Sequence, residues 1–204
     1  MTGWHWQLGA VIGAAGLLLA SAPTSPAQSR QAPGEWRGYG ADSASTKYSP
    51  LDHIDASNFE QLRVAWSWDT ADLRILAAHP DDARMRRAGF KATPLMVDGV
   101  LFVSTGLGQI AALDAATGLT RWVHDPDSFA GGPPANVIGF QTRGVAHWSD
   151  GTDERILFGT SDGYMVAVDA RTGAPVAEFG DGGKVDLTTG IPGAERGKSP
   201  QLVA

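Results

Sequence analysis

The chain has 204 residues, 43% hydrophobic and 19% charged, which suits a globular protein with one good-sized domain or two small ones. A formal net charge of −6 without a basic run argues against nucleic acid as a partner, and the absence of cysteine excludes a disulfide framework and a thiolate metal site. The 26 Gly, 12 Pro and 7 Trp favour a turn-rich β protein over a helical bundle.

The first predicted element is a secretion signal at residues 1–27. This stretch has no Lys, Arg, Asp or Glu, and its apolar run LGAVIGAAGLLLA is 13 residues long, too short to cross a bilayer comfortably. Small residues at Ser25 and Ala27 suit cleavage after Ala27. Because no Lys or Arg precedes the apolar run, an uncleaved N-terminal membrane anchor is the alternative. In both cases we expect the rest of the chain outside the inner membrane.

Residues 28–63 are predicted to form an irregular leader rich in Gly, Ser and Asp. Within it, Ser57 followed three residues later by Glu60 predicts one short helical turn with Ser57 as its N-cap. The alternating stretch from Val64 to Trp68 predicts a strand. The charged segment from Asp72 to Arg87 is expected to be a surface excursion with helical pieces.

From Ala92 onward, short apolar or alternating runs recur at regular spacing and predict four-stranded antiparallel units. The first unit reads TPLMV, VLFVS, QIAALD and TRWVH, and the second reads GVAHW, RILFGT, YMVAVD and PVAEF. Such repeated units are typical of propeller blades. We therefore predict an all-β fold, with a partial β-propeller over residues 64–204. Its blades are expected at approximately 92–124 and 142–180, and a third begins at 200.

The third strand of each unit leads into the same turn, ALDAATG at 112–118 and AVDARTG at 167–173. The Asp side chain can accept hydrogen bonds from the N–H groups of the turn, and the Gly can supply a left-handed residue. Trp122 then lies in the fourth strand, where an indole can wedge between neighbouring sheets and find a partner for its N–H. Trp66 is predicted to do the same from the preceding strand.

The pattern A-x-D-x-x-T-G-x-x-x-W at 112–122 resembles the tryptophan-docking motif of the quinoprotein dehydrogenases. YSPL at 48–51, ATPL at 92–95 and RGVAHW at 143–148 follow the order and spacing of the same family. Its members are periplasmic eight-bladed propellers that use pyrroloquinoline quinone (PQQ). The resemblance covers residues 35–204. It implies an N-terminal fragment of such an enzyme, with about two blades and an N-terminal closing strand.

The resemblance also implies a chemistry. Such an enzyme oxidises an alcohol or an aldose by hydride transfer to the quinone, with Ca²⁺ as electrophile and an Asp as base. A cytochrome c or a quinone then accepts the electrons. The Ca²⁺ ligands and the catalytic Asp of the family would lie beyond Ala204. No catalytic or metal-binding residue is therefore assigned here, and we expect the fragment alone to be inactive.

Three residues are candidates for cofactor binding by this resemblance. Arg143 aligns with an arginine that contacts PQQ, and its planar fork suits a carboxylate; the alternative is an inter-blade salt bridge. Thr142 could donate a hydroxyl hydrogen bond beside it. Lys91 falls where the family has an acidic or amide contact, and it could pair with a PQQ carboxylate or lie in solvent. Val137 and Ile138 replace the adjacent cysteines of many members, so a stacking surface there would be aliphatic.

Two other functions remain open. The first is a cofactor-free scaffold propeller, like the periplasmic lipoprotein that helps to assemble outer-membrane proteins. Such scaffolds share docking-type repeats, but this chain has no lipobox cysteine and has a long leader, and both features favour the enzyme. The second is an inert product of a truncated gene. A catalytic Asp and Ca²⁺-binding carboxylates downstream would support the enzyme over either alternative.

Overall fold

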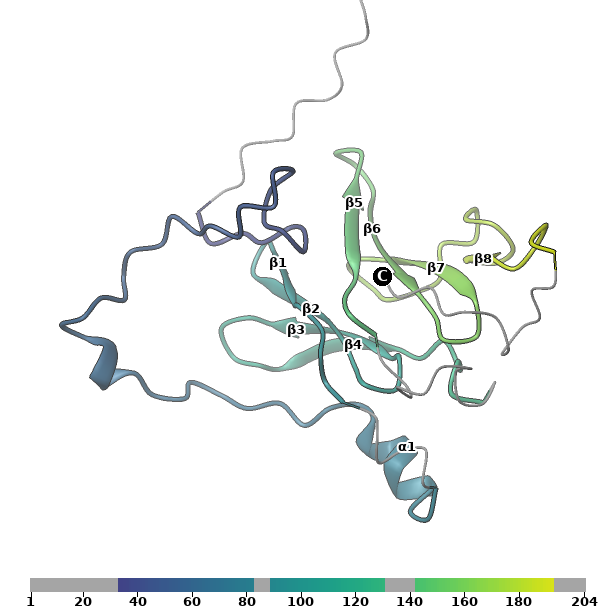
Figure 1. The fold of residues 1–204 in the computed structure, drawn as a ribbon, viewed down its shortest axis with the longest axis horizontal. Coiled ribbons are helices and arrows are strands. Elements are labelled where there is room, and N and C mark those ends of the chain that lie inside the picture. Colours follow the sequence, from purple (N-terminus) through teal and green to yellow (C-terminus); the bar gives the residue numbers. More distant parts are fainter. Residues whose placement is uncertain (1–32, 83–88, 131–141, 193–204) are drawn as a thin grey trace, which may run out of the picture. The chain divides into compact units, whose positions relative to one another are not determined.

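The computed structural model describes residues 33–82, 89–130 and 142–192. They form two four-stranded antiparallel sheets, and the residues before the first sheet carry a 3₁₀ helix and a short α-helix (Figure 1). The prediction of an all-β fold made of four-stranded units is confirmed. Within these ranges, no helix is both long enough and apolar enough to cross a membrane. The predicted signal at 1–27 and the third unit at 200 lie outside the described residues.

The first sheet has its strands in sequence order. They are β1 (Leu95–Val97), β2 (Val100–Ser104), β3 (Ile110–Asp114) and β4 (Thr120–His124). Phe102 pairs with Leu95 on one side and with Ala112 on the other, and Ala112 pairs in turn with Trp122. Because cross-strand partners share a face, these side chains form one row across the sheet.

The second sheet repeats this order. Its strands are β5 (Ala146–Ser149), β6 (Glu154–Gly159), β7 (Tyr164–Asp169) and β8 (Lys184–Asp186). The predicted fourth strand, PVAEF, is therefore wrong. Pro175 makes only an isolated bridge to Val168, because the chain turns directly after it, with the N–H of Phe179 donating to the carbonyl of Val176 at 2.9 Å. A turn in which the N–H of Gly183 donates to the carbonyl of Phe179 (3.0 Å) then delays regular pairing until β8.

One apolar core joins the two sheets. It is built from residues of both sheets, among them Leu95, Val97, Phe102, Ile110, Ala112, Ile156, Phe158, Val166 and Val168. Fully burying a side chain of this size stabilises a fold by about 1.5–3 kcal/mol. The opposite face of the first sheet has a smaller cluster, in which Val103, Ala111 and Leu113 pack against the indoles of Trp66 and Trp68.

The repeated turn has the structure that its sequence predicts. The Oδ1 atom of Asp114 accepts hydrogen bonds from the backbone N–H of Ala116 (3.2 Å), the N–H of Thr117 (3.1 Å) and the Thr117 hydroxyl (2.9 Å). Arg121 donates to the other oxygen at 2.8 Å, and this bond, together with the bonds from Thr117, lowers the pKa of Asp114 to about 2. Asp169 accepts the equivalent bonds in the second sheet.

Both predicted indoles dock on these turns. The Nε1–H of Trp122 donates to the carbonyl of Ala170 at 3.0 Å, and the Nε1–H of Trp66 donates to the carbonyl of Ala115 at 3.1 Å. At Gly173, φ is +73° and a Cβ would lie 2.6 Å from the Trp122 ring, so only glycine suits the position. Each indole therefore joins its own segment to the turn of the next sheet along the chain.

His124 lies in the same contact between the sheets. Its Nδ1 is 3.1 Å from the carbonyl of Gly173, its ring packs edge-on against Phe158, and its buried Nε2 has no hydrogen-bond partner among the described residues. Burial lowers the pKa of His124, and the positive charge of Lys184 adds to this effect. The folded protein therefore holds this imidazole neutral, with Nδ1–H as the donor to Gly173.

The pH dependence of stability follows from this histidine. Because the pKa of His124 is lower in the folded than in the unfolded protein, the unfolded protein binds more protons below pH 6.5, the ordinary value, and stability is lost as pH falls. We expect His124→Asn, whose amide can still donate to Gly173, to lose less stability between about pH 7 and about pH 5. Urea unfolding at several pH values in this range measures how the free energy of unfolding changes with pH. An equal change in the variant and the unsubstituted protein would contradict the role of His124.

The segment before the first sheet differs from two predictions. Val64 to Trp68 is not a strand, because its backbone forms no ladder with any described residue; it is held instead by side chains, including a 2.9 Å bond from the Trp68 indole to the Thr120 hydroxyl. The 3₁₀ helix η1 (Phe59–Gln61) has Asn58 as its N-cap, so the prediction for Ser57 is wrong. The Ser57 hydroxyl instead donates to the Asp55 carboxylate at 2.6 Å.

Candidate functional site

The predicted cofactor residues lie at one end of the sheets. In an antiparallel sheet, the residues that enter the first strand lie beside the turn between the second and third strands. Lys91 precedes β1, and Thr142 and Arg143 precede β5. They therefore share an end with the β2–β3 turn (105–109), while the indole-docking turns occupy the opposite end.

A backbone hydrogen bond brings the two predicted cations onto adjacent segments. The N–H of Thr93 donates to the carbonyl of Arg143 at 3.1 Å, which places the residues after Lys91 alongside Arg143. Both cationic side chains are exposed. Among the described residues, neither forms a side-chain hydrogen bond or an ion pair, so the alternative of an inter-blade salt bridge for Arg143 is not realised there.

Thr142 lies beside the β2–β3 turn. At Gly108, φ is +87°, and a Cβ there would be 3.7 Å from the Thr142 hydroxyl and 3.0 Å from the hydroxyl of Ser128. Among residues that the structure describes, the hydroxyl of the buried Ser128 has no hydrogen-bond partner. Val137 and Ile138, the predicted aliphatic surface, lie outside the described residues.

The sequence did not predict the buried role of Asp72. This residue is only 5% exposed, and its carboxylate accepts hydrogen bonds from the Thr105 hydroxyl at 2.6 Å and from the N–H of Leu107 at 3.0 Å. Burial raises the pKa of Asp72, and these two hydrogen bonds act against that rise. The prediction of a surface excursion is therefore wrong at its first residue, because the Asp72 side chain is buried against the β2–β3 turn.

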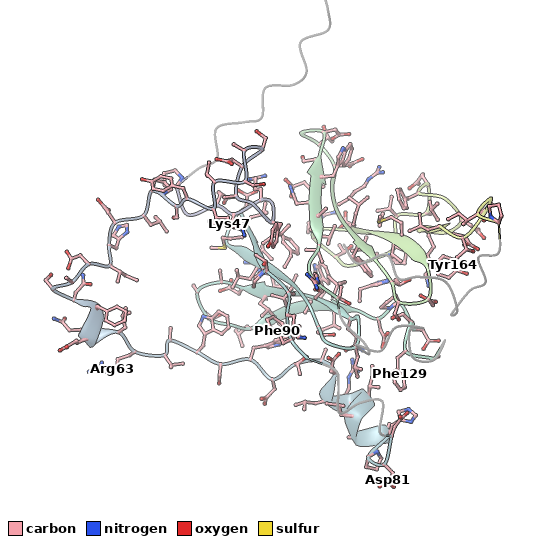
Figure 2. The ribbon with its side chains drawn as sticks, in the orientation of Figure 1. Lys47, Arg63, Asp81, Phe90, Phe129 and Tyr164 are labelled. Atoms are coloured by element: carbon pink, nitrogen blue, oxygen red, sulfur yellow. The ribbon has the colours of Figure 1, made fainter. Side chains whose placement is uncertain are left out.

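A small apolar cluster accompanies this carboxylate. The helix α1 (Leu73–Ala78) follows Asp72 directly, and its Ile75 and Leu76 pack on Leu107, which is 1% exposed. Phe129, which is labelled in Figure 2, packs against the same leucine. In the sequence, the adjacent apolar residues Ile75 and Leu76 indicate that one face of this segment is packed. They do not indicate that it packs against Leu107.

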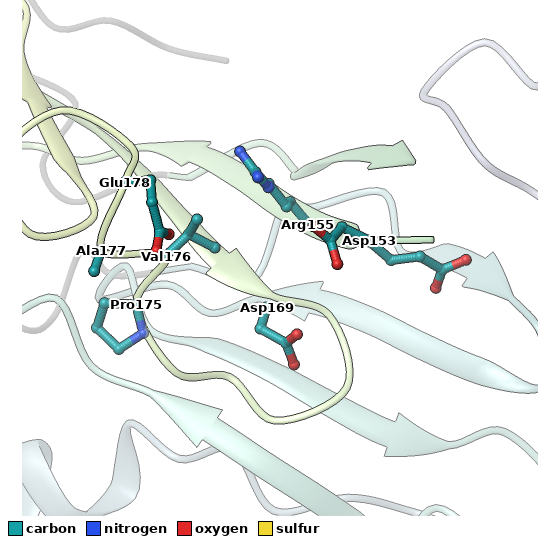
Figure 3. Close-up of a pocket in the computed structure, with 8 residues that line it drawn as sticks. Asp153, Arg155, Asp169, Pro175, Val176, Ala177 and Glu178 are labelled. Atoms are coloured by element: carbon teal, nitrogen blue, oxygen red, sulfur yellow. The ribbon is translucent and has the colours of Figure 1, made fainter. Parts of the chain in front are cut away.

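The described residues also form a cavity at the other end of the second sheet (Figure 3). Its lining is Asp153, Glu154, Arg155, Asp169, Pro175, Val176, Ala177 and Glu178. None of the predicted cofactor residues is among them. Four of the eight lining residues are acidic, which makes this cavity unsuitable for an anionic ligand such as PQQ.

A comparison with family models decides the family. The model described as "PQQ: Glucose/ethanol/alcohol dehydrogenase, beta-propeller domain" matches residues 36–203, well over half of the chain. The chain belongs to this PQQ-dependent dehydrogenase family. The resemblance predicted from the docking motif, the leader and RGVAHW is thereby confirmed, and the two described sheets are parts of a PQQ-type propeller.

Individual members of the PQQ family agree with this assignment. The chain is 35% identical over 170 residues to quinohemoprotein alcohol dehydrogenase ADH IIB of Pseudomonas putida, covering 82% of the chain and 22% of that protein. It is 35% identical over 178 residues to quinoprotein glucose dehydrogenase of Gluconobacter oxydans, covering 81% and 21%. The crystal structure of quinohemoprotein alcohol dehydrogenase from Comamonas testosteroni matches with a TM-score of 0.58 and 29% identity, over 80% of this chain and 21% of that one. The chain thus spans about a fifth of the length of these relatives.

Proposed function

We propose that this chain supplies the first blades and part of the cofactor site of a periplasmic PQQ-dependent dehydrogenase. The observation that carries the proposal is the pair of exposed cations, Lys91 and Arg143, on segments joined by the bond between Thr93 and Arg143. Both charges lack a partner among the described residues and lie at the end of the sheets away from the acidic cavity. Such a surface fits the carboxylates of PQQ.

Each residue would contribute a different contact. The planar guanidinium of Arg143 can hold one carboxylate with two parallel hydrogen bonds, the ammonium of Lys91 can act as a compact point charge, and the hydroxyl of Thr142 can donate a third bond. Bound PQQ would supply an ortho-quinone that accepts hydride from the substrate. Together these groups would fix the orientation of the cofactor and offset its negative charge.

The reaction and its partners are proposed from the relatives. Several relatives are named alcohol dehydrogenases, one is a 1-butanol dehydrogenase (cytochrome c), and one is a glucose dehydrogenase. We therefore propose an alcohol substrate, with an aldose as the second candidate, and a cytochrome c or a quinone as electron acceptor. We also propose a Ca²⁺ ion bound by residues beyond Ala204. In the described part of the chain, no three His, Asp or Glu residues are grouped to hold a metal ion.

Reconstitution tests the proposal. The encoded polypeptide, meaning the whole product of the gene including any residues after Ala204, is expressed with export to the periplasm. PQQ is then titrated into it in the presence of Ca²⁺, and binding is followed by the absorbance of PQQ. The polypeptide is then assayed with a panel of alcohols and aldoses and an artificial electron acceptor. We expect saturable PQQ binding and alcohol-dependent reduction of the acceptor. The isolated 204 residues serve as the comparison and are expected to show no turnover. Absence of PQQ binding in the encoded polypeptide would refute the proposed function.

A further inference from the structure

Asp72 connects a distant part of the chain to the β2–β3 turn. Its carboxylate receives the Thr105 hydroxyl and the Leu107 N–H, which follow it by 33 and 35 residues. The Thr105 hydroxyl is used twice, because it also accepts the N–H of Gln109 at 3.0 Å. The turn is therefore held by one hydrogen bond within it, from Gln109 to Thr105, and by two hydrogen bonds from Thr105 and Leu107 to Asp72.

The fixed turn lies against the segment that enters β5. Gly108 follows Leu107 directly, and a Cβ at this position would lie 3.0 Å from the Ser128 hydroxyl and 3.7 Å from the Thr142 hydroxyl, so the turn borders both side chains. Thr142 is adjacent to Arg143 in the chain. A displaced turn would therefore change the space open to the Thr142 side chain, and with it the position of Arg143, because protein interiors are packed without room to spare.

The second sheet provides an internal comparison. Its β6–β7 turn has the same core, in which the hydroxyl of Thr160, 55 residues after Thr105, accepts the N–H of Tyr164 at 3.0 Å. That hydroxyl lies 3.3 Å from the carbonyl of Tyr164, to which it can donate. Among the residues that the structure describes, no carboxylate bonds to Thr160. Of the β2–β3 and β6–β7 turns, only the first is held by a carboxylate among the described residues; we call this contact the Asp72 clamp.

We propose that Asp72 is a positioning residue for the cofactor site: by clamping Thr105 and Leu107, it fixes the β2–β3 turn against Thr142 and so sets the orientation of Arg143. This inference rests on the proposed function. Asp72 touches neither the cofactor nor the substrate. Its contribution is to preorganise the segment 142–143, whose misplacement would weaken binding of PQQ without removing any contact group.

Three variants of the encoded polypeptide test the inference by PQQ titration and thermal unfolding. Thr105→Val has nearly the shape of threonine but removes the donor to Asp72, and we expect about tenfold weaker PQQ binding. Thr105→Ser keeps the hydroxyl and is expected to restore the affinity. Thr160→Val is the control, because it removes the same hydroxyl from the unclamped turn. We expect it to lower the Tm, though less than Thr105→Val because no buried carboxylate loses a donor, and to leave the affinity for PQQ unchanged.

The outcomes separate positioning from general stability. Unchanged PQQ affinity in Thr105→Val, or equal weakening in Thr160→Val, would overturn the inference while leaving the proposed function intact. If Thr105→Val fails to fold, Asp72→Glu takes its place. This variant keeps both acceptor oxygens but displaces them by one methylene, and wild-type affinity in it would likewise overturn the inference. Absence of PQQ binding in the unsubstituted protein would instead overturn the proposed function, and this inference with it.

Discussion

Replacing Trp122 by alanine is expected to lower the free energy of unfolding by about 3 kcal/mol, because a large, partly buried aromatic group is lost from the contact between the two sheets. The indole packs against Phe102 with ring centroids 5.9 Å apart, lies on Gly173, and donates its N–H to the carbonyl of Ala170 at 3.0 Å. Equilibrium unfolding in urea, monitored by circular dichroism, measures the change.

Two further tryptophan variants identify the source of this loss. Trp122→Phe keeps an aromatic ring but removes the donor to Ala170, and it is expected to cost about 1 kcal/mol for the hydrogen bond, plus a smaller loss of contact area. Trp148→Ala is the matched control, because this indole is 43% exposed and the Arg155 guanidinium lies over its ring at 4.9 Å. It should cost less than about 1 kcal/mol. Equal losses from Trp122→Ala and Trp148→Ala would contradict the docking role.

The docking motif could be predicted because its chemistry is local. Asp114, Thr117 and Gly118 form a closed set of hydrogen bonds within one turn, so their spacing in the sequence determines their geometry. The docking of Trp122 on the second turn could also be predicted, because a repeated turn offers a repeated docking surface. Only the acceptor, the carbonyl of Ala170, came from the structure. The family could be predicted for the same reason, since its signature consists of such local motifs.

The errors arose where the partner was distant or where a local rule was overridden. Asp72 is buried through contacts to residues more than 30 positions away, and no spacing in the sequence indicates that pairing. In PVAEF the apolar pattern suited a strand, but the chain turns between Val176 and Phe179, and the regular pairing moves to β8 (Lys184–Asp186). Val64 to Trp68 had the alternation of a strand without a hydrogen-bonding neighbour among the described residues.

The candidate site was predictable only by resemblance. Nothing in the composition distinguishes Arg143 from the other exposed arginines, and its role depends on the family motif RGVAHW. The structure adds two facts that the motif does not contain: the bond that places Thr93 beside Arg143, and the position of Gly108 next to the Thr142 side chain. These contacts turn three separate candidates into residues on neighbouring segments, which is a condition for binding one ligand.

Replacing Arg143 by alanine is expected to weaken PQQ binding by about thirtyfold, equivalent to about 2 kcal/mol for the loss of hydrogen bonds to a charged carboxylate. Arg143→Lys keeps the positive charge but loses the planar fork, so we expect an intermediate loss of affinity. Neither variant should change the Tm appreciably, because the side chain is exposed and has no partner in the described structure, while the backbone carbonyl that accepts from Thr93 is retained.

The control for this prediction is Arg171→Ala, which removes an exposed arginine from the indole-docking turn at the opposite end of the second sheet. It lowers the net charge of the protein by the same amount as Arg143→Ala. A purely long-range electrostatic effect would therefore weaken PQQ binding in both variants and would fade at high salt, since charges farther apart than about 10 Å are screened at 0.1 M ionic strength. Direct contact predicts a loss confined to Arg143 that persists in salt. Equal affinities in Arg143→Ala and the unsubstituted protein would remove Arg143 from the cofactor site.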